Sequence, residues 1–468
     1  MKNDIIGGIA MKKVKYIVLA SLLAVSSWVN AQTAKSGYFL DGTLYNYQLN
    51  PAMDAERGFF SLLAGNMSMG TSGNVGISNF LYPYGDDKLT TFMSGTVATD
   101  KFLGRLPKAI RLGTDVNGTL LAAGFRMFGG YTTFGVTVHS SLSVSLPKGF
   151  FEFAKKGFSE NAYSFGGMGL NTMNYAAATI GHSREIIDGL RVGVNLKYLV
   201  GLAYANATID KLDVEMNEQH WMVQSQASAN AALISESRLT VDENGVISGV
   251  ETGPFAPSAS GFGVDLGVVY DMKNIVPGLT LSASVIDMGR INWKYMMGLE
   301  ANDASVEFDG FEEIDPNDFE GSTADELAQL GEDAAKMLEL QSNGLSSMST
   351  KLNTTMYLGA EYNMPFYTPL SVAVLYGKRF SEADIAELSE FRGYVNIAPL
   401  KWLEASVNVG HTTFGTSLGW MVNVHPAGAN FFIGSDYMIT KVTPQFIPVN
   451  NFNSHITLGV NVTFGERK

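Results

Sequence analysis

The stretch SHITLGVNVTF, residues 454–464, lies close to the C-terminus and alternates strictly between two kinds of side chain. One face is entirely apolar, whereas the other face is small or polar: Ile456, Leu458, Val460, Val462 and Phe464 against His455, Thr457, Gly459, Asn461 and Thr463. Because successive side chains of a β-strand point to opposite faces, the pattern predicts a strand with one apolar face. That face must contact either a protein core or lipid.

The same alternation recurs along the chain, for example over residues 131–146, 190–204, 262–271 and 414–425. Several of these runs span about ten residues or more, whereas strands of soluble proteins average about five or six. Short connections between runs alternate with long ones, with one short exception near 411–413. This is the pattern of outer-membrane barrels. We therefore expect the apolar face to contact lipid, with Tyr204, Tyr270 and Phe464 in aromatic girdles.

The predicted fold is all-β, a transmembrane antiparallel β-barrel of about 14 strands within limits of about 12–16, with short helices in outer loops. An extra hairpin could lie within 70–113. An even strand number places both termini in the periplasm. The predicted strands are 59–79, 114–127, 131–146, 164–182, 190–208, 260–271, 279–297, 353–364, 369–379, 390–398, 401–410, 413–424, 429–440 and 454–464.

The composition supports a membrane protein and excludes several classes of site. Charged residues make up 16% of the 468 residues, against roughly 25% in soluble domains. The absence of cysteine excludes disulfides, thiolate metal sites, a cysteine nucleophile and a lipoprotein anchor. The net charge is −13, and residues 302–340 alone hold 13 acidic residues against one lysine. No basic surface is evident, so we expect no nucleic-acid partner.

The N-terminus resembles a secretory signal. From Met11, the expected true start, three lysines precede an apolar run over 17–29, and Ala31 precedes an expected cleavage site at Gln32. We thus expect a signal peptide over 1–31, an N-terminal periplasmic or lumenal lead over 32–58, and a barrel over 59–468. The predicted location is the outer membrane of a Gram-negative cell, with outer-membrane lipid as a partner.

Two connections carry helical patterns. The acidic outer loop 299–352 includes an amphipathic pattern from Thr323 to Leu338 with a capping box. It is interpreted as a solvated lid, with a cation or partner site as the alternative. Its DPNDFEG stretch lacks the residue order of a calcium loop. A second helix is expected over 146–158, lying at the outer interface or over the barrel mouth.

The lead ends in Asn50-Pro51-Ala52 just before the first predicted strand, and this step resembles the N-terminal motif of the FadL-type outer-membrane barrels. GFGVDLGVVYDM (261–272) followed by LSASVIDMGRINW (281–293) is similar to a paired strand signature of the PorV-like branch, and the layout resembles a PorV/PorP-like family. The resemblance implies a 14-stranded barrel with an N-terminal segment in the lumen. Asn50, Pro51 and Ala52 are then a candidate hatch. The resemblance does not imply one function, since barrel folds host many.

No enzymatic motif is present around the six histidines, so we expect neither an enzyme nor a cofactor or metal site. The inward charges Arg191, Lys197 and Asp265 are expected to form a lumenal ion-pair network. Two functions stay open: FadL-like transport of hydrophobic or amphipathic small molecules, and a structural or accessory barrel for a secretion or surface-protein assembly system. A continuous apolar tunnel with a side opening favours transport, whereas a plugged lumen with a broad outer surface favours a protein partner.

Overall fold

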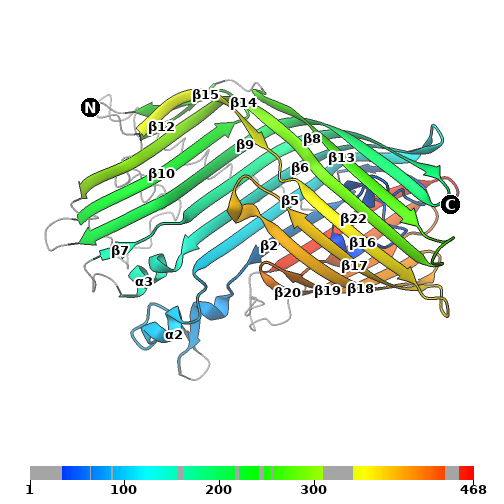
Figure 1. Cartoon of the computed structure of the whole chain (residues 1–468), viewed down its shortest axis with the longest axis horizontal. Coiled ribbons are helices and arrows are strands. Elements are labelled where there is room, and N and C mark those ends of the chain that lie inside the picture. The colour runs from blue at the N-terminus through cyan, green and yellow to red at the C-terminus, as the bar shows by residue number, and fades with distance from the viewer. Residues whose placement is uncertain are drawn as a thin grey trace.

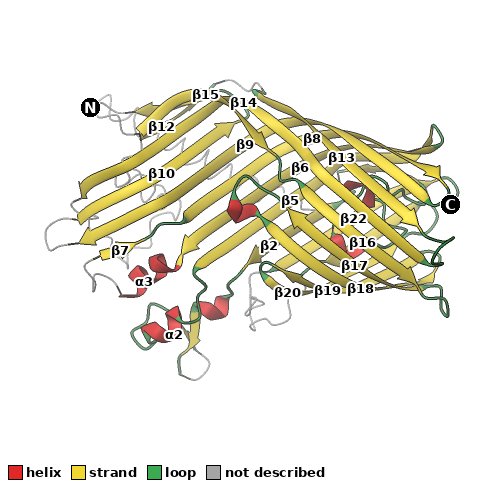
Figure 2. Ribbon diagram, viewed as in Figure 1, coloured by secondary structure: helices red, strands yellow, loops and turns green. Residues whose placement is uncertain are grey.

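The computed structural model describes residues 34–63, 65–85, 88–156, 162–216, 221–241, 247–253, 257–308, 341–437 and 453–467. The described chain forms a closed antiparallel β-barrel with a sheet extension at one end (Figures 1 and 2). The predicted signal peptide lies outside the described residues. Among those residues, no helix is both long enough and apolar enough to span a bilayer.

Fourteen strand positions close the barrel in the described part of the chain, as predicted. The circle closes where the strand next to the lead pairs with the last strand, with Phe59 opposite Thr463. In order around the barrel, the strands are β1 Gly58–Leu62 with β2 Met67–Gly73, β5 Ala109–Met127, β6 Gly130–Pro147, β8 Met168–Ile187, β9 Leu190–Met216, β13 Ala259–Asp271, β14 Leu279–Phe308, β16 Thr355–Asn363, β17 Leu370–Arg379, β18 Leu388–Leu400, β19 Leu403–Thr412, β20 Gly415–Val424, β21 Ala429–Ser435 and β22 Ser454–Phe464.

The barrel has a turn end and a loop end. At the turn end short connections join the strands, for instance residues 128–129, 188–189 and 401–402. At the loop end the connections include 74–108, 148–167 and 380–387. The topology expected above makes the turn end periplasmic and the loop end external.

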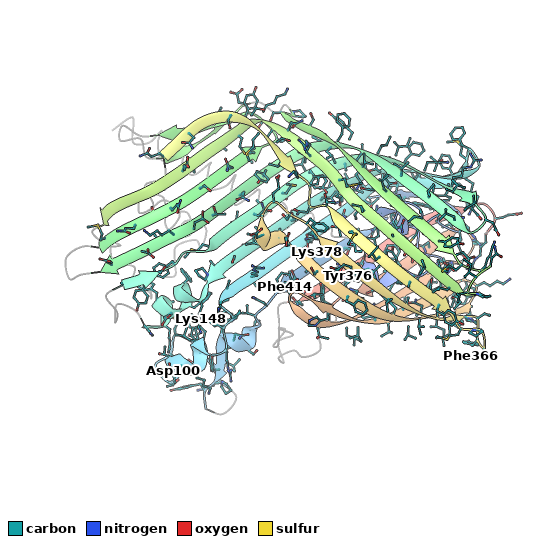
Figure 3. All side chains as sticks on the ribbon, viewed as in Figure 1. Asp100, Lys148, Phe366, Tyr376, Lys378 and Phe414 are labelled. Carbon is teal, nitrogen blue, oxygen red and sulfur yellow. The ribbon has the colours of Figure 1, made fainter. Side chains whose placement is uncertain are left out.

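The exposed faces of the strands answer the question raised by residues 454–464. Along β22, Leu458 is 39% exposed and Val460 is 51% exposed, whereas Thr457 is fully buried. The apolar face therefore points away from the lumen, and the predicted register is confirmed. Comparable apolar side chains are exposed on other strands of the barrel, including Tyr376 of β17, labelled in Figure 3. A belt of this kind matches the lipid-facing surface of an outer-membrane barrel.

A wall of longer strands continues the barrel on one side of the loop end. β9 has 27 residues and β14 has 30, whereas a spanning strand needs only about 9–11. In the wall, β10 (Trp221–Leu233) continues the position of β13 and pairs with both β9 and β14. β15 (Gln341–Lys351) likewise continues the position of β16 beside β14. These long strands extend to the left in Figure 1.

Several sequence predictions need correction at this end. The acidic loop was expected over 299–352, but β14 continues to Phe308 and β15 begins at Gln341. The helix predicted from Thr323 to Leu338 lies outside the described residues. The connection between the predicted strands 190–208 and 260–271 contains β10 and a separate hairpin, β11 (Ser237–Val241) with β12 (Ile247–Thr252). These segments are polar, so their strand pairing carried no lipid-facing signal.

Two further predictions are wrong because the backbone of the strands is locally irregular. The first strand, expected as continuous over 59–79, is interrupted between β1 and β2, where the Gly65 carbonyl accepts a hydrogen bond from Asn461 in the lumen. Tyr204 was expected in an outward aromatic girdle but is buried beside Trp293. The register between β8 and β9 shifts after Gly201, so the extra residue turns Tyr204 to the inward face.

The region 74–110 forms a small outer subdomain instead of another barrel hairpin. It contains η3 (Ile77–Asn79), a hairpin of β3 (Leu81–Pro83) and β4 (Leu89–Thr91), and α2 (Thr99–Leu103). Its buried core includes Phe102 and Leu106, with Phe151 of α3 packed against it. α3 covers Lys148–Lys156, so the helix predicted over 146–158 is confirmed at the loop end.

Deletion tests whether the barrel needs the acidic segment 309–340 in order to fold. Replacing 309–340 with about ten Gly/Ser residues is expected to leave the barrel folded, because such a linker spans about 33 Å. The gap is eight residues of β14 beyond the Glu300–Gln341 pair, or roughly 26 Å of strand. The measurement is heat-dependent migration on a gel. A larger deletion of 303–345 removes β14 residues paired with β10, and should lower the temperature at which the folded form is lost. Equal stability of the two deletions would contradict this assignment.

Candidate functional site

The N-terminal lead, described here from residue 34 to residue 57, fills much of the barrel lumen (Figure 1, dark blue). It contains two short 3₁₀ turns, η1 (Lys35–Gly37) and η2 (Asn46–Gln48). Most of its side chains are buried, and Ser36, Tyr45, Asn50 and Ala52 are fully buried. Because the lead has little regular secondary structure to pair its backbone polar groups, it can be buried only if the barrel wall supplies hydrogen-bond partners.

The first anchor of the lead is a set of charged groups on the inner wall. The carboxylate of Asp436 accepts hydrogen bonds from the backbone N–H groups of Lys35 and Ser36, at 3.1 and 2.8 Å. The ammonium of Lys35 lies 2.6 Å from Glu390, and Arg392 donates to Glu390 at 3.0 Å. These side chains are at most 5% exposed.

The charge of Lys35 is held in place by its partner. Burial by itself lowers the pKa of a lysine, but the carboxylate of Glu390 raises the pKa of Lys35 above its ordinary value. Lys35 is therefore protonated throughout the physiological range. The ion pair joins the lead to β18 in a setting where loss of either partner leaves an uncompensated charge.

The middle of the lead is held by tyrosines and amides. Tyr45 donates to Asn461 of β22 at 2.6 Å, and its ring packs edge-on against Phe59 of β1. The carbonyl of Tyr47 accepts from Asn195 of β9 at 3.2 Å. The lead is thus attached to strands on both sides of the lumen.

The Asn50-Pro51-Ala52 step forms a tight turn against the wall. The Asn50 side chain donates to the carbonyls of Val268 and Ala283 at 3.3 and 3.4 Å. Its own oxygen accepts from the backbone N–H of Ala52 at 3.0 Å. One amide therefore closes the turn internally and fastens it to β13 and β14.

Two glycines of the wall make room for this turn. A Cβ at Gly267 of β13 would overlap the Asn50 side chain and the Pro51 ring, and a Cβ at Gly193 of β9 would overlap the Pro51 carbonyl. The backbones can approach this closely only because neither position has a side chain. The sequence shows both glycines, but it does not show that both contact Pro51.

Two cavities lie against opposite sides of the lead in the described lumen. The loop-side chamber, of about 110 Å³, is lined by Tyr47, Gln48 and Leu49 of the lead. The turn-side cavity, of about 420 Å³, is lined by Asn46, Ala52 and Met53. Of the residues on β9, Asn195 and Lys197 line the chamber, whereas Arg191, which lies nearer the turn end, lines the turn-side cavity. The segment 46–53 therefore lies between the two spaces.

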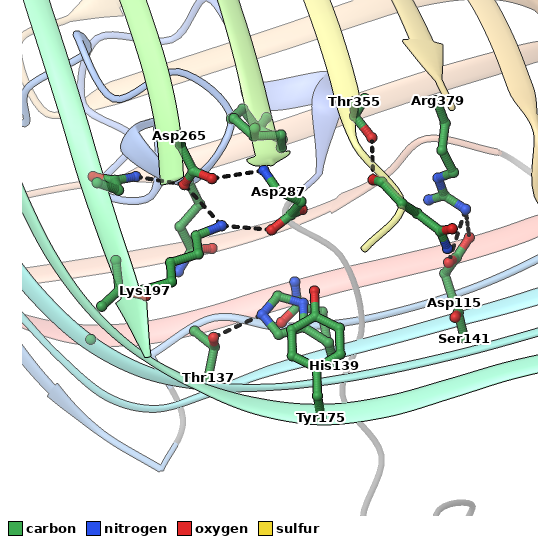
Figure 4. A pocket seen from close by; sticks show the side chains of 18 of the residues that line it. Asp115, Thr137, His139, Ser141, Tyr175, Lys197, Asp265, Asp287, Thr355 and Arg379 are labelled. Atoms are coloured by element: carbon green, nitrogen blue, oxygen red, sulfur yellow. Dashed lines mark hydrogen bonds and ion pairs between the residues drawn. The ribbon is translucent and has the colours of Figure 1, made fainter. Parts of the chain in front are cut away.

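Charged side chains line the loop-side chamber (Figure 4). Lys197 bridges Asp265 at 2.8 Å and Asp287 at 2.6 Å. Arg379 of β17 donates to both carboxylate oxygens of Asp115 of β5, each at 3.2 Å. His139 stacks on Tyr175 with ring centres 4.7 Å apart and bonds Thr137 at 2.8 Å.

The ion-pair network predicted among Arg191, Lys197 and Asp265 is present but divided. Lys197 and Asp265 share the chamber with Asp287, whereas Arg191 pairs with Asp54 of the lead at the turn-side cavity. Lys35, Glu390, Arg392 and Asp436 were not singled out from the sequence. For Glu390 and Arg392 the available signal was a charged residue at an inward position of an alternating strand, whereas Lys35 lies in the lead and Asp436 follows the last residue of β21. Within the described residues, no group of three or more His, Asp or Glu could hold a metal ion.

The closed strand circle, the outward apolar belt and the filled lumen define a plugged outer-membrane-type β-barrel. The chain belongs to the family described as a family of unknown function, DUF5723, whose model matches residues 51–436. No curated protein matches the chain.

Solved structures similar to this chain include barrels of the FadL type. The P. putida toluene transporter TodX matches with a TM-score of 0.38 and 8% sequence identity, over 94% of this chain and 96% of that chain. The Ralstonia pickettii toluene transporter TbuX matches with a TM-score of 0.37 and 9% identity, over 95% of this chain and 97% of that chain. A Pseudomonas aeruginosa FadL homologue matches with a TM-score of 0.41 and 11% identity, over 93% of this chain and 99% of that chain. The similarity to a PorV/PorP-like family stays a prediction.

Proposed function

We propose that the protein is a gated passage for small amphipathic molecules across the outer membrane, with the segment 46–53 of the lead as the gate. The observation that carries the proposal is that one turn, fastened by Asn50, lies between two cavities at different depths of the same lumen. Both cavities are lined by charged and polar side chains mixed with apolar ones, such as Met173 and Ile286 in the chamber and Met53 in the turn-side cavity. This lining is unlike the continuous apolar tunnel expected for a FadL-type hydrocarbon transporter, so amphipathic solutes fit it better than purely hydrophobic ones.

The gate is tested by removing its fastening. Asn50→Ala removes the hydrogen bonds to Val268 and Ala283 and the internal bond to Ala52. Buried hydrogen bonds contribute about 1 kcal/mol each, so the open population should rise about tenfold or more. The measurement is entry of small solutes into liposomes that contain the purified protein. Gly267→Ala should act in the same direction, because its methyl group would displace the Asn50 side chain.

The matched control is Asn274→Ala. Asn274 also donates a side-chain hydrogen bond, to Asp188 at 3.1 Å, but lies in an exposed turn outside the lumen. Passage should stay at the wild-type rate in this variant. Unchanged passage in both lumen variants, with the barrel folded, would argue that the lead is a fixed plug.

A fixed plug would favour the second candidate, an accessory barrel that binds a surface or secretion protein. The observation in its favour is the wall of β9, β10, β14 and β15, whose strands extend well past the length that a bilayer requires. Native mass spectrometry of the protein extracted from its own membrane separates the candidates. A stoichiometric protein partner, together with unchanged passage in Asn50→Ala, supports the accessory role.

A further inference from the structure

We infer that the loop-side chamber is a binding site for a small organic cation, of the class of primary amines, and that it is closed toward the outside by the segment 380–387. This inference names the molecule for the gate proposed above. It rests on that proposal for passage, whereas binding in the chamber can be measured by itself.

An ion pair crosses the barrel beside the chamber. Arg379 and Asp115 lie on β17 and β5, seven strand positions apart in either direction around the fourteen-position circle. Their contact at 3.2 Å therefore joins diametrically opposite walls. The charged groups of these residues line the chamber directly (Figure 4). This crossing pair narrows the lumen on its loop side.

The strap, residues 380–387, follows Arg379 and reaches the same opposite wall. Its 3₁₀ turn η4 (Asp384–Ala386) contacts β6 and β8, and Ile385 lies against Gly169 of β8. The strap is tied at its base by Phe380, whose N–H donates to the Thr354 carbonyl at 2.8 Å, and by the ion pair of Glu382 with Lys351. The crossing ion pair and the strap therefore lie on the loop side of the chamber, and segment 46–53 lies on its turn side.

The charges lining the chamber do not cancel. Its lining holds three carboxylates, Asp115, Asp265 and Asp287, against two cations, Lys197 and Arg379. The carboxylate of Asp265 is fully buried and bonded to Lys197, Asn195 and the Asp287 N–H. Asp287 bonds Lys197 through one oxygen, and its side chain is 19% exposed. The excess negative charge in a walled space favours a cation, and Asp287 is the carboxylate open to it.

The backbone at Asp287 holds this carboxylate in a constrained position. Asp287 has φ of 59°, in the left-handed region, at a register shift between β13 and β14. Such a conformation costs about 1–3 kcal/mol in a non-glycine residue and persists where the surroundings enforce it. Here the Asp265 carboxylate accepts the Asp287 N–H at 2.7 Å, and Thr354 donates to the Asp287 carbonyl at 3.1 Å.

A second, independent feature is the Tyr47 hydroxyl. Tyr47 is 5% exposed and lines the chamber, and its hydroxyl lies near the Gln48 side chain but makes no hydrogen bond of good geometry in the described structure. Buried hydroxyls are almost always bonded, so this group fits a ligand atom or a water. The rings of Tyr175 and Tyr357 also line the space. Aromatic faces attract ammonium groups, and an unsatisfied hydroxyl can bond the polar end of such a molecule.

The size of the chamber limits the ligand. An apolar cavity of about 150 Å³ holds one benzene molecule, so the chamber of about 110 Å³ admits only a few non-hydrogen atoms in this closed state. A long hydrocarbon chain does not fit. A compact amine with one further polar group fits the volume of the chamber, balances its excess negative charge and can bond the Tyr47 hydroxyl.

Three compounds of matched size test the inference on the purified full chain in detergent: ethanolamine, ethylene glycol and glycolate. All three are too polar to enter micelles. Ligand-observed NMR titration should show ethanolamine binding at least tenfold more tightly than the neutral and anionic compounds. Asp287→Asn should weaken ethanolamine binding at least tenfold. Asparagine has the same shape and tolerates left-handed backbone, so the fold should be retained.

Asp188→Asn, in an exposed turn, is the control and should bind as wild type does. Stronger binding of glycolate, equal binding in Asp287→Asn, or no binding by a folded barrel would each overturn the inference. In the last case the chamber would hold only water. The gate is judged separately: faster solute passage in Asn50→Ala without ethanolamine binding keeps the gate and discards the amine site. Ethanolamine binding with unchanged passage does the reverse.

Discussion

Replacing Leu458 or Val460 with arginine is expected to destabilise the folded barrel by about 2–4 kcal/mol, because either change places a charge near the middle of the lipid-facing belt. Both side chains are substantially exposed on the outer face of β22, which pairs with β21 on one side and with β1 and β2 on the other. The result is read from the yield of heat-modifiable, membrane-assembled protein. Leu458→Met is the matched control and should assemble normally.

The inward face of the same strand offers no tolerant control, although the sequence suggested one. Thr457 and Asn461 lie on the small or polar face, where the alternation by itself predicts that arginine is tolerated, but both are buried against neighbouring segments. Asn461 bonds Tyr45 of the lead, the Gly65 carbonyl and Asn430. Arginine at either position should also impair assembly, by steric overlap. Normal assembly of Leu458→Arg would refute the lipid-facing assignment.

Glu390→Ala is expected to cost about 3–5 kcal/mol of stability, since it leaves two buried cations, Lys35 and Arg392, without their shared carboxylate. Lys35 lies 2.6 Å from Glu390, and Arg392 is fully buried beside it. The lead should also loosen, because Lys35 is one of its first anchors. A drop in the temperature of heat-dependent gel migration measures the first effect.

The loosening can be followed with a thiol reagent, because the chain contains no cysteine of its own. Ser36→Cys places a unique thiol at a fully buried position of the lead. This thiol should be protected in the otherwise wild-type barrel and react quickly when Glu390→Ala is added. Lys273→Ala, which removes an exposed ion pair with Asp188, should change neither stability nor labelling. Wild-type stability of Glu390→Ala would show that the buried cluster is dispensable.

The sequence by itself determined the barrel, the approximate strand positions and the lipid-facing register. A strand in a lipid bilayer must leave no backbone polar group unpaired and must alternate apolar with small or polar side chains, so each strand carries its own local signature. Residues 454–464, 370–379 and 415–424 carry this signature clearly. The inward charges Lys197 and Asp265 could also be identified, because they interrupt the small polar face of otherwise regular strands.

The tertiary structure alone decided what fills the lumen and which charges meet. Ser36 and Asp436 are 400 residues apart in sequence, and Arg379 meets Asp115 across the full width of the barrel. No local pattern encodes such pairs, because they depend on strand number, register and the path of the lead at once. Irregular backbone also could not be predicted from local sequence. The register shifts near Gly201 and Asp287 change which side chains point inward, and only the pairing with neighbouring strands fixes where such shifts occur. The inward position of Tyr204 and the constrained position of the Asp287 carboxylate both follow from these shifts.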